Sequence, residues 1–132
     1  MNLPDHITFW QKQSDEDWDT ALLLASGKRN LMALFAIHPS LEKILNAHWI
    51  KDNFEITPPR SHDLQYLYKN SDLELNAEDY GYLAIISGWN IEGRYPDYKQ
   101  KISKMATPEF LQKQLENANR IRLCLQEKLL II

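Results

Sequence analysis

The chain has 132 residues, of which 44% are hydrophobic and 25% are charged, and its formal net charge is −3. This composition is typical of one folded domain and excludes a disordered chain, and the acidic balance excludes a globally basic surface for nucleic acid. The single cysteine, Cys124, excludes an internal disulfide and fits a reducing cytoplasm. We expect neither a signal peptide nor a membrane-spanning segment.

Two long helices are predicted in the first half of the chain, over residues 5–26 and 30–52. Apolar residues at spacings of three and four give the first helix one apolar face, and Gly27 is expected to end it in the left-handed conformation. The second helix is apolar around most of its surface, which predicts a place at the centre of a bundle or in a dimer contact. Pro39 inside it removes one backbone hydrogen bond, so we predict a kink near Phe35.

His38 and Glu42 lie one turn apart on the mostly apolar side of this second helix. Buried polar groups need hydrogen-bonding partners. We therefore interpret the two residues as a buried His–Glu pair, or as a pair bonded to an arginine from another helix. A role in binding a ligand is the alternative.

A corner is predicted at residues 58–64, where two consecutive prolines stop the preceding structure. Ser61 is expected to cap a short helix that runs to residue 70. Arg60 and His62 stand at this turn beside a helix N-terminus, a place suited to an anion. The alternative is a capped corner in which the arginine and the histidine pair with neighbouring carboxylates.

The second half of the chain predicts two further helices joined by a long basic loop. One helix spans residues 76–92, where Asn76 and Asp79 resemble a capping box, and the last helix begins with Thr107 as its cap. The segment 94–106 between them is expected to be a loop. Its tyrosines and basic residues suit stacking on a base and holding a phosphate, although a solvated loop with tyrosines laid over the core would have the same composition.

These elements predict one all-α domain over residues 1–132, an up-and-down helical bundle of four long helices plus one short helix. The four apolar residues at positions 129–132 are expected to pack on the bundle or to take part in an interface.

Four short motifs occur in this order along the chain. They are Asp17-Trp18-x-x-Ala21, Phe35-x-x-His38-x-x-x-Glu42-Lys43, Pro58-Pro59-Arg60-Ser61-His62-Asp63-Leu64 and Gly93-Arg94-Tyr95-Pro96-Asp97. In order and spacing the sequence resembles the HEPN domains (higher eukaryotes and prokaryotes nucleotide-binding). The resemblance implies a prokaryotic HEPN-like bundle, a homodimer, and pairing with a minimal nucleotidyltransferase encoded next door, in a system of the toxin–antitoxin kind. Some relatives are ribonuclease toxins, and others are thought to bind nucleotides.

The sequence departs from the nucleolytic members of that family, which carry an arginine followed four to six residues later by a histidine. No histidine follows Arg94, and Arg60 and His62 are only two positions apart. Cleavage of RNA without a metal needs a base such as histidine and a cation that stabilises the charged phosphorane. We therefore lean against an enzyme and predict no catalytic residue. The lysine that usually follows the Glu-Lys pair is Asn46 here.

We predict a non-catalytic cytoplasmic HEPN-domain protein that binds a nucleotide, a nucleotidyltransferase partner, or both. The predicted ligand-binding residues are Arg60, His62, Asp63, Arg94, Tyr95, Asp97, His38, Glu42 and Lys43. The two arginines would hold phosphates and Tyr95 would stack on the base. We expect no metal, no cofactor and no membrane partner.

Two alternatives remain open. The first is a metal-free ribonuclease toxin acting on RNA through a displaced pair, Arg94 with His38 or His62. The second is a purely structural assembly partner, in which the residues Arg60, Arg94, Glu42 and Asp97 form a buried network.

Overall fold

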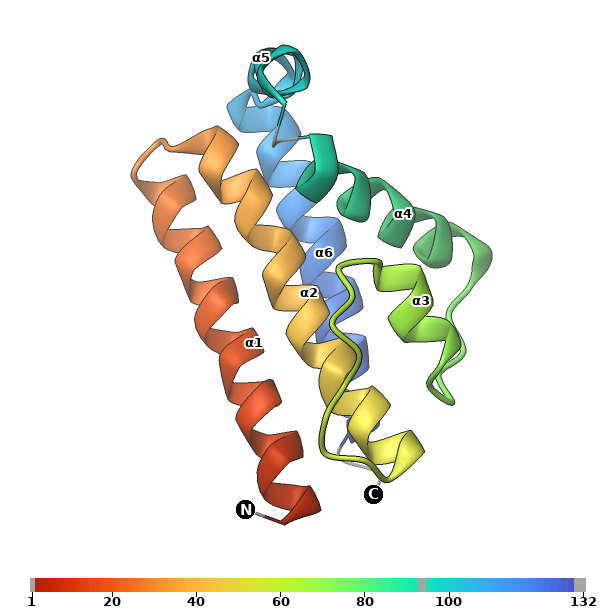
Figure 1. The fold of residues 1–132 in the computed structure, drawn as a ribbon. Coiled ribbons are helices and arrows are strands. Elements are labelled where there is room, and N and C mark those ends of the chain that lie inside the picture. Colours follow the sequence, from red (N-terminus) through yellow and green to blue (C-terminus); the bar gives the residue numbers. More distant parts are fainter. Residues whose placement is uncertain (1, 93–94, 130–132) are drawn as a thin grey trace.

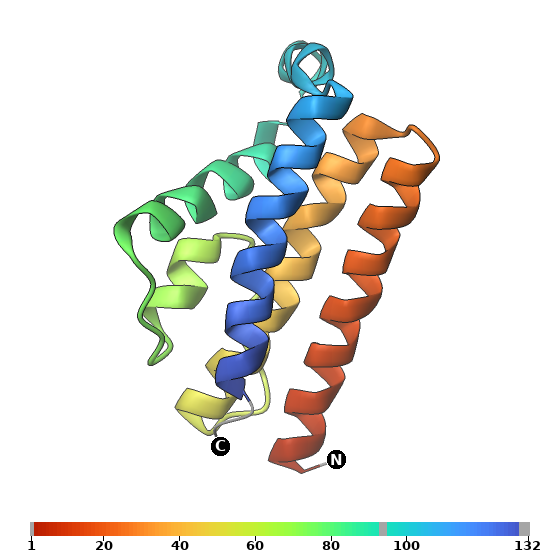
Figure 2. The same ribbon diagram turned by 180° about the vertical axis from the view of Figure 1, so that it is seen from behind.

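All regular structure in the described residues, 2–92 and 95–129 of a computed structural model, is helical. The helices are α1 (Leu3–Ser26), α2 (Asn30–Asn53), α3 (Leu64–Lys69), α4 (Ala77–Glu92), α5 (Pro96–Met105) and α6 (Pro108–Leu129). Helices α1, α2 and α6 lie side by side, α3 and α4 cover one flank of α2, and α5 lies across one end (Figure 1, Figure 2). The all-α bundle predicted from the sequence is confirmed.

Helix α2 is the centre of the core. Its side chains Leu34, Ile37, Leu41, Ile44 and Leu45 are fully buried, and burial of each side chain of this size contributes roughly 1.5–3 kcal/mol. This confirms that the almost uniformly apolar helix occupies the middle of the bundle. The helix runs without interruption from Asn30 to Asn53, so the proline inside it does not divide it.

Several helix starts are capped by side chains, at the predicted Asn76 and Thr107 and also at Asn2, which was not predicted as a cap. At the start of α1 the Asn2 side chain accepts a hydrogen bond from the Asp5 backbone N–H at 2.9 Å. The Asn76 side chain accepts from the Asp79 N–H at 2.7 Å, and the Thr107 hydroxyl accepts from the Phe110 N–H at 3.1 Å. Each of these bonds satisfies a backbone donor that the first turn of a helix leaves free.

The prediction of a loop over residues 94–106 was wrong for most of that segment, because residues 96–105 form helix α5. Pro96 occupies the first helical turn and Asp97 complements the helix dipole there. Ile102 is 3% exposed and anchors the helix to the core. The segment is mostly hydrophilic, and its one buried apolar residue within the helix, Ile102, gives too weak a periodic pattern to predict a helix.

Two turn predictions were also wrong. Asp63, not Ser61, caps α3, since its carboxylate accepts from the N–H groups of Gln65 and Tyr66 at 3.0 and 3.3 Å. After α1, Gly27 has a φ of −82°, and the left-handed residue is Lys28, with a φ of 61°.

Within the described part of the chain, none of the helices combines the length and apolar content needed to cross a membrane. The apolar residues predicted at positions 130–132 to pack or to form an interface lie outside the described residues.

Candidate functional site

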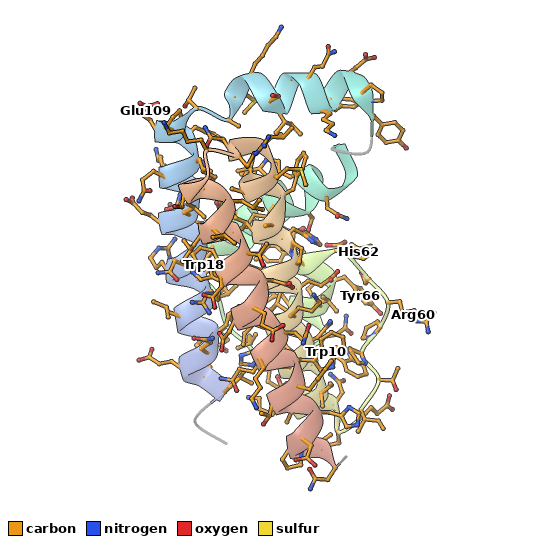
Figure 3. The ribbon with its side chains drawn as sticks, turned by 90° about the vertical axis from the view of Figure 1, so that its left-hand side faces the viewer. Trp10, Trp18, Arg60, His62, Tyr66 and Glu109 are labelled. Carbon is orange, nitrogen blue, oxygen red and sulfur yellow. The ribbon has the colours of Figure 1, made fainter. Side chains whose placement is uncertain are left out.

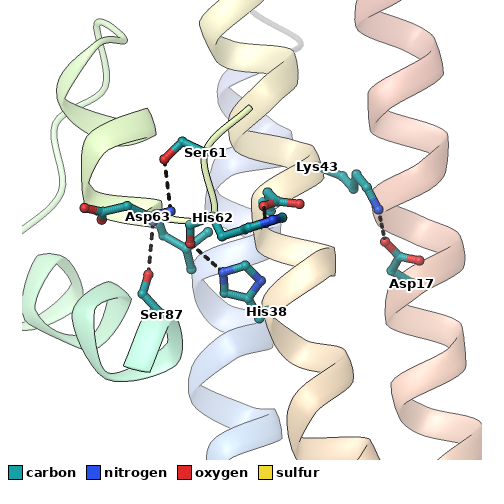
Figure 4. A network of polar contacts seen from close by, with 9 residues as sticks. Asp17, His38, Lys43, Ser61, His62, Asp63 and Ser87 are labelled. Atoms are coloured by element: carbon teal, nitrogen blue, oxygen red, sulfur yellow. Dashed lines mark hydrogen bonds and ion pairs between the residues drawn. The ribbon is translucent and has the colours of Figure 1, made fainter. Parts of the chain in front are cut away.

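Residues 57–63, called here the corner segment, run without regular secondary structure between α2 and α3 and are tied to two helices. On one side, His38 of α2 donates from Nε2 to the backbone carbonyl of His62, with 2.7 Å between the two atoms. On the other side, the N–H of Leu64, next after the segment, donates to the Ser87 hydroxyl of α4 at 3.0 Å (Figure 4). The corner segment is therefore held against the bundle in a defined position.

His38 acts as a buried anchor for this segment. Its side chain is 2% exposed, and burial lowers its pKa, so the ring is neutral at physiological pH. Because a carbonyl oxygen can only accept, the Nε2 atom of His38 carries the proton. The predicted partner was wrong: His38 bonds to backbone of the corner segment and not to Glu42 or to an arginine.

Glu42 pairs instead with His62. The His62 Nδ1 atom donates to the Glu42 carboxylate at 2.6 Å, where the glutamate side chain is 13% exposed and the histidine side chain is 60% exposed. A carboxylate bound at Nδ1 sets the orientation of an imidazole and leaves Nε2 as the nitrogen that a ligand or a substrate can reach. The exposed histidine is thus oriented by a largely buried acid.

A hollow of about 400 Å³, called here the α2 hollow, opens between the corner segment, α1 and α2. It is lined by Trp10, Glu42, Lys43, Asn46 and residues 57–62. Figure 3 shows Trp10 of α1 and the corner residues Arg60 and His62 on the same side of the molecule. Cavities of this size are within the range of small-molecule sites.

The charged groups of the α2 hollow differ in how far they are already paired. Lys43 donates to Asp17 of α1 at 2.6 Å, and His62 is held by Glu42. Arg60 is exposed and forms no ion pair with any described carboxylate. Arg60 is therefore the lining cation whose charge is least compensated.

Asn46 is the buried polar side chain of the α2 hollow whose oxygen lacks a partner among the described residues. It is 5% exposed, and its Oδ1 atom is buried without a hydrogen bond to any described residue. An unpaired buried acceptor costs roughly 1–3 kcal/mol, which is why most such atoms are satisfied in folded proteins.

Two further hollows adjoin this one, since they share lining residues with it. The α4 hollow, about 570 Å³, contains Arg60, Ser61 and His62 together with Ser87 and Gly88 of α4. The α1 hollow, about 370 Å³, is mostly apolar and is lined by His6, Phe9, Trp10, Ile56, Thr57 and Pro58. The corner segment is thus flanked by open space on more than one side.

A family model described as HEPN domain matches residues 7–128 of the chain. The chain belongs to the HEPN domain family. A search of curated proteins and a search of solved structures each found no match. Since the match covers nearly the whole chain, the corner segment and the lining residues of the three hollows, apart from His6, all lie within the HEPN domain.

The HEPN fold brings together six of the predicted ligand-binding residues. Around the corner segment lie Arg60, His62, Asp63, His38, Glu42 and Lys43. Tyr95 and Asp97 lie apart from them, exposed at the start of α5, where the Tyr95 ring contacts that of Tyr98 with 6.3 Å between centroids. Arg94 lies outside the described residues.

The buried structural network suggested as an alternative is not formed by its described members. Arg60 and Asp97 are exposed, and Glu42 pairs with a histidine and not with an arginine. Among the described residues, no group of three or more His, Cys, Asp or Glu side chains is placed to hold a metal ion.

Of the residues that α1 and α2 contribute to the α2 hollow, two were not predicted as site residues. Trp10, an apolar residue of α1, is only half-buried and lines the hollow. Asn46 was noted only as a departure from the family pattern. A signal for it exists in the sequence: His38, Glu42 and Asn46 follow one another at intervals of one turn, which forms a polar row along an otherwise apolar helix.

Proposed function

We propose that this HEPN domain binds a nucleotide in the α2 hollow. One observation carries the proposal: the corner segment brings Arg60 and His62 to the same hollow as Lys43, Asn46 and Trp10. An arginine fork suits phosphate, an aromatic ring suits a base, and an amide can hydrogen-bond the edge of that base. The volume of about 400 Å³ suits a mononucleotide better than a polymer.

The charge distribution supports a defined orientation for this nucleotide. Glu42 contributes a carboxylate to the α2 hollow, so phosphate is disfavoured beside it. Arg60 is exposed and unpaired with described carboxylates, which makes it the preferred phosphate contact. Phosphates would therefore lie toward Arg60 and the base toward Trp10.

The predicted homodimer, the nucleotidyltransferase partner and a role in a toxin–antitoxin pair rest on the resemblance to the family. Two exposed apolar side chains near the corner segment support a protein contact there: Phe54 is 79% exposed and Ile56 is 49% exposed. Apolar side chains exposed together are a common mark of interaction surfaces. A purely structural assembly role would use the same surface without a nucleotide.

Thermal unfolding in the presence of nucleoside triphosphates tests the nucleotide site. A ligand at about one hundred times its dissociation constant stabilises the native state by roughly 2.7 kcal/mol. We expect this stabilisation in the wild type and in Arg29→Ala, and its loss in Arg60→Ala. Arg29 is a matched control, because it is exposed and lines none of the three hollows. Absence of stabilisation by every nucleotide would refute the proposal.

A second candidate function, ribonuclease activity, is favoured by the Glu42–His62 pair. In such a reaction His62 Nε2 takes the proton of the RNA 2′-hydroxyl, the 2′-oxygen bonds to phosphorus, and the 5′-oxygen leaves with a proton from water. Arg60 would stabilise the negative charge on the phosphorane. The family's own arginine–histidine spacing is absent, so this pair would be a displaced one.

Incubation of the pure protein with transfer RNA and messenger RNA, without added metal, tests this second function. If it holds, cleavage disappears in His62→Gln and falls strongly in Glu42→Gln. The His6→Gln control, at a half-buried histidine of α1 outside the α2 hollow, cleaves like the wild type. No cleavage at high protein concentration would refute it and leave nucleotide binding as the function to pursue.

A further inference from the structure

The end of the bundle that α5 crosses is positively charged, although the chain as a whole is acidic. Residues 27–32 and 95–110 lie at this end (Figure 1), and among them two carboxylates, Asp97 and Glu109, stand against five cations. Their net charge is therefore +3, whereas that of the whole chain is −3. The five cations, called here the basic end, are Lys28, Arg29, Lys99, Lys101 and Lys104.

Two segments that are distant in the sequence form the basic end together. The Asn30 side chain at the start of α2 donates from Nδ2 to the Ala106 carbonyl, directly after α5, at 3.1 Å. Figure 1 and Figure 2 both show the turn between α1 and α2 at the same end of the bundle as α5. All five basic residues are exposed, and none forms an ion pair with a described carboxylate. Their charge is therefore accessible to an anion in solution.

Exposed aromatic rings adjoin these charges. Tyr95 is 57% exposed and Tyr98 is 51% exposed, although burial of an aromatic ring is favourable. The two rings meet edge to face, with 6.3 Å between their centroids. Lys101 and Lys104 continue from Tyr98 at intervals of three residues, so each lies beside the next on the surface of the helix. Helix α5 thus presents rings and cations in one row.

We propose that the basic end and the two tyrosines of α5 bind single-stranded nucleic acid. Lysine and arginine attract phosphates of any sequence, and tyrosine rings stack on unpaired bases. A double helix would supply the phosphates but keeps its bases stacked within the duplex. An acidic protein segment would match the charge, but it does not account for the exposed pair of rings.

This surface is separate from the α2 hollow. None of its residues lines any of the three hollows around the corner segment. Figure 3 shows α5 across the end of the bundle, apart from Arg60 and His62 of the corner segment. The inference is therefore independent of the proposed function, and the domain can hold a mononucleotide in the α2 hollow and a strand at the basic end.

Fluorescence anisotropy with a labelled single-stranded uridine oligonucleotide tests the contribution of charge. Three to five phosphate contacts should weaken binding by roughly 20- to 100-fold between about 50 and about 200 mM salt. Lys101→Gln/Lys104→Gln should weaken binding and lower the slope of log affinity against log salt by about 1.4. Lys12→Gln/Lys69→Gln removes the same charge from exposed positions on α1 and α3, and it should bind like the wild type.

The contribution of the rings is measured with the same oligonucleotide. Tyr98→Ala should weaken binding by about 5- to 150-fold without changing the salt slope, because one stacked base is lost and no charge. Tyr98→Phe keeps the ring and should bind like the wild type. A duplex of equal length should bind the wild type more weakly than the single strand. A thymidine DNA oligonucleotide shows whether the surface distinguishes DNA from RNA, and binding of either supports the proposal.

Three results would overturn the proposal. The first is no binding of either oligonucleotide at about 50 mM salt. The second is loss of binding in Arg60→Ala with wild-type affinity in Lys101→Gln/Lys104→Gln, which would place the strand at the corner segment. The third is displacement of the oligonucleotide by polyglutamate as effectively as by unlabelled RNA of equal charge, which would assign the surface to an acidic protein segment.

Discussion

The free energy of unfolding should depend on pH through His48, a buried histidine that joins helices α2 and α6. His48 of α2 is fully buried and donates from Nε2 to the Leu125 carbonyl of α6 at 2.7 Å. Burial lowers the pKa of His48 from 6.5 to about 4, since no described acceptor pairs with its Nδ1 atom. The folded protein therefore keeps this ring neutral at pH values where the unfolded chain already protonates it.

The size of the effect follows from the two pKa values. A group with a lower pKa in the folded state binds fewer protons there, so the free energy of unfolding falls as the pH drops. The contribution of neutral His48 to the free energy of unfolding is complete above pH 6.5 and is lost progressively as the pH falls to about 4. The full difference of 6.5 − 4 = 2.5 units corresponds to about 3–4 kcal/mol, at about 1.4 kcal/mol for each unit, and about 3 kcal/mol of this is lost by pH 4.

Urea unfolding at a series of pH values measures this loss. His48→Gln is the comparison, because glutamine keeps an N–H donor for Leu125 and does not titrate. Between neutral pH and about pH 4, the wild type should lose about 3 kcal/mol more stability than the variant. His38, whose pKa is also lowered by burial, contributes to both proteins and cancels in the difference. Parallel pH profiles for the two proteins would refute the assignment.

Three further substitutions test the site and the corrected fold. Asn46→Leu should raise the free energy of unfolding of the ligand-free protein by roughly 1–3 kcal/mol in urea titrations, because it removes an unpaired buried acceptor; a loss of stability would contradict this. Ile102→Ala should cost about 2–5 kcal/mol and speed amide exchange across residues 96–105, whereas unchanged exchange would mean that α5 does not depend on this contact. His38→Leu should leave the bundle folded but increase proteolysis within residues 57–63, and equal cleavage of both proteins would show that the His38 hydrogen bond does not hold the corner segment.

Much of the fold could be predicted from the sequence because its signals are local. The apolar spacing of α1, the uniform apolarity of α2 and the caps at Asn76 and Thr107 each depend on residues within a few positions of one another. Helix α5 was missed because its stability depends on Ile102 packing against helices distant in the sequence. A mostly hydrophilic segment with one buried residue carries too weak a periodic signal to separate a helix from a loop.

The candidate site was predictable in its residues but not in their partners. The prolines and the Arg-Ser-His run located the corner, and the helical spacing placed His38 and Glu42 on one face. The hydrogen bond from His38 to a backbone carbonyl joins positions 24 residues apart, and it depends on how the corner segment packs. The lack of a hydrogen-bonding partner for Asn46 Oδ1 likewise depends on how side chains distant in the sequence pack around it.

The two candidate functions use the same residues in different ways. For binding, Arg60 would matter most, because it would hold the phosphates of the proposed nucleotide. For cleavage, His62 and Glu42 matter most, because they move a proton. Conservative variants of these residues therefore separate a nucleotide-binding HEPN domain from a ribonuclease more clearly than deletion of the corner segment would.

The most direct test of the nucleotide site is a titration of the ¹⁵N-labelled protein with ATP, followed by two-dimensional NMR. We expect the amide signals of residues 42–46 and 57–63, and the indole signal of Trp10, to shift together with one dissociation constant. Arg60→Ala should weaken that constant while leaving the rest of the spectrum unchanged. Shifts confined to α5, around Tyr95 and Asp97, or no shifts at all, would contradict a nucleotide site in the α2 hollow.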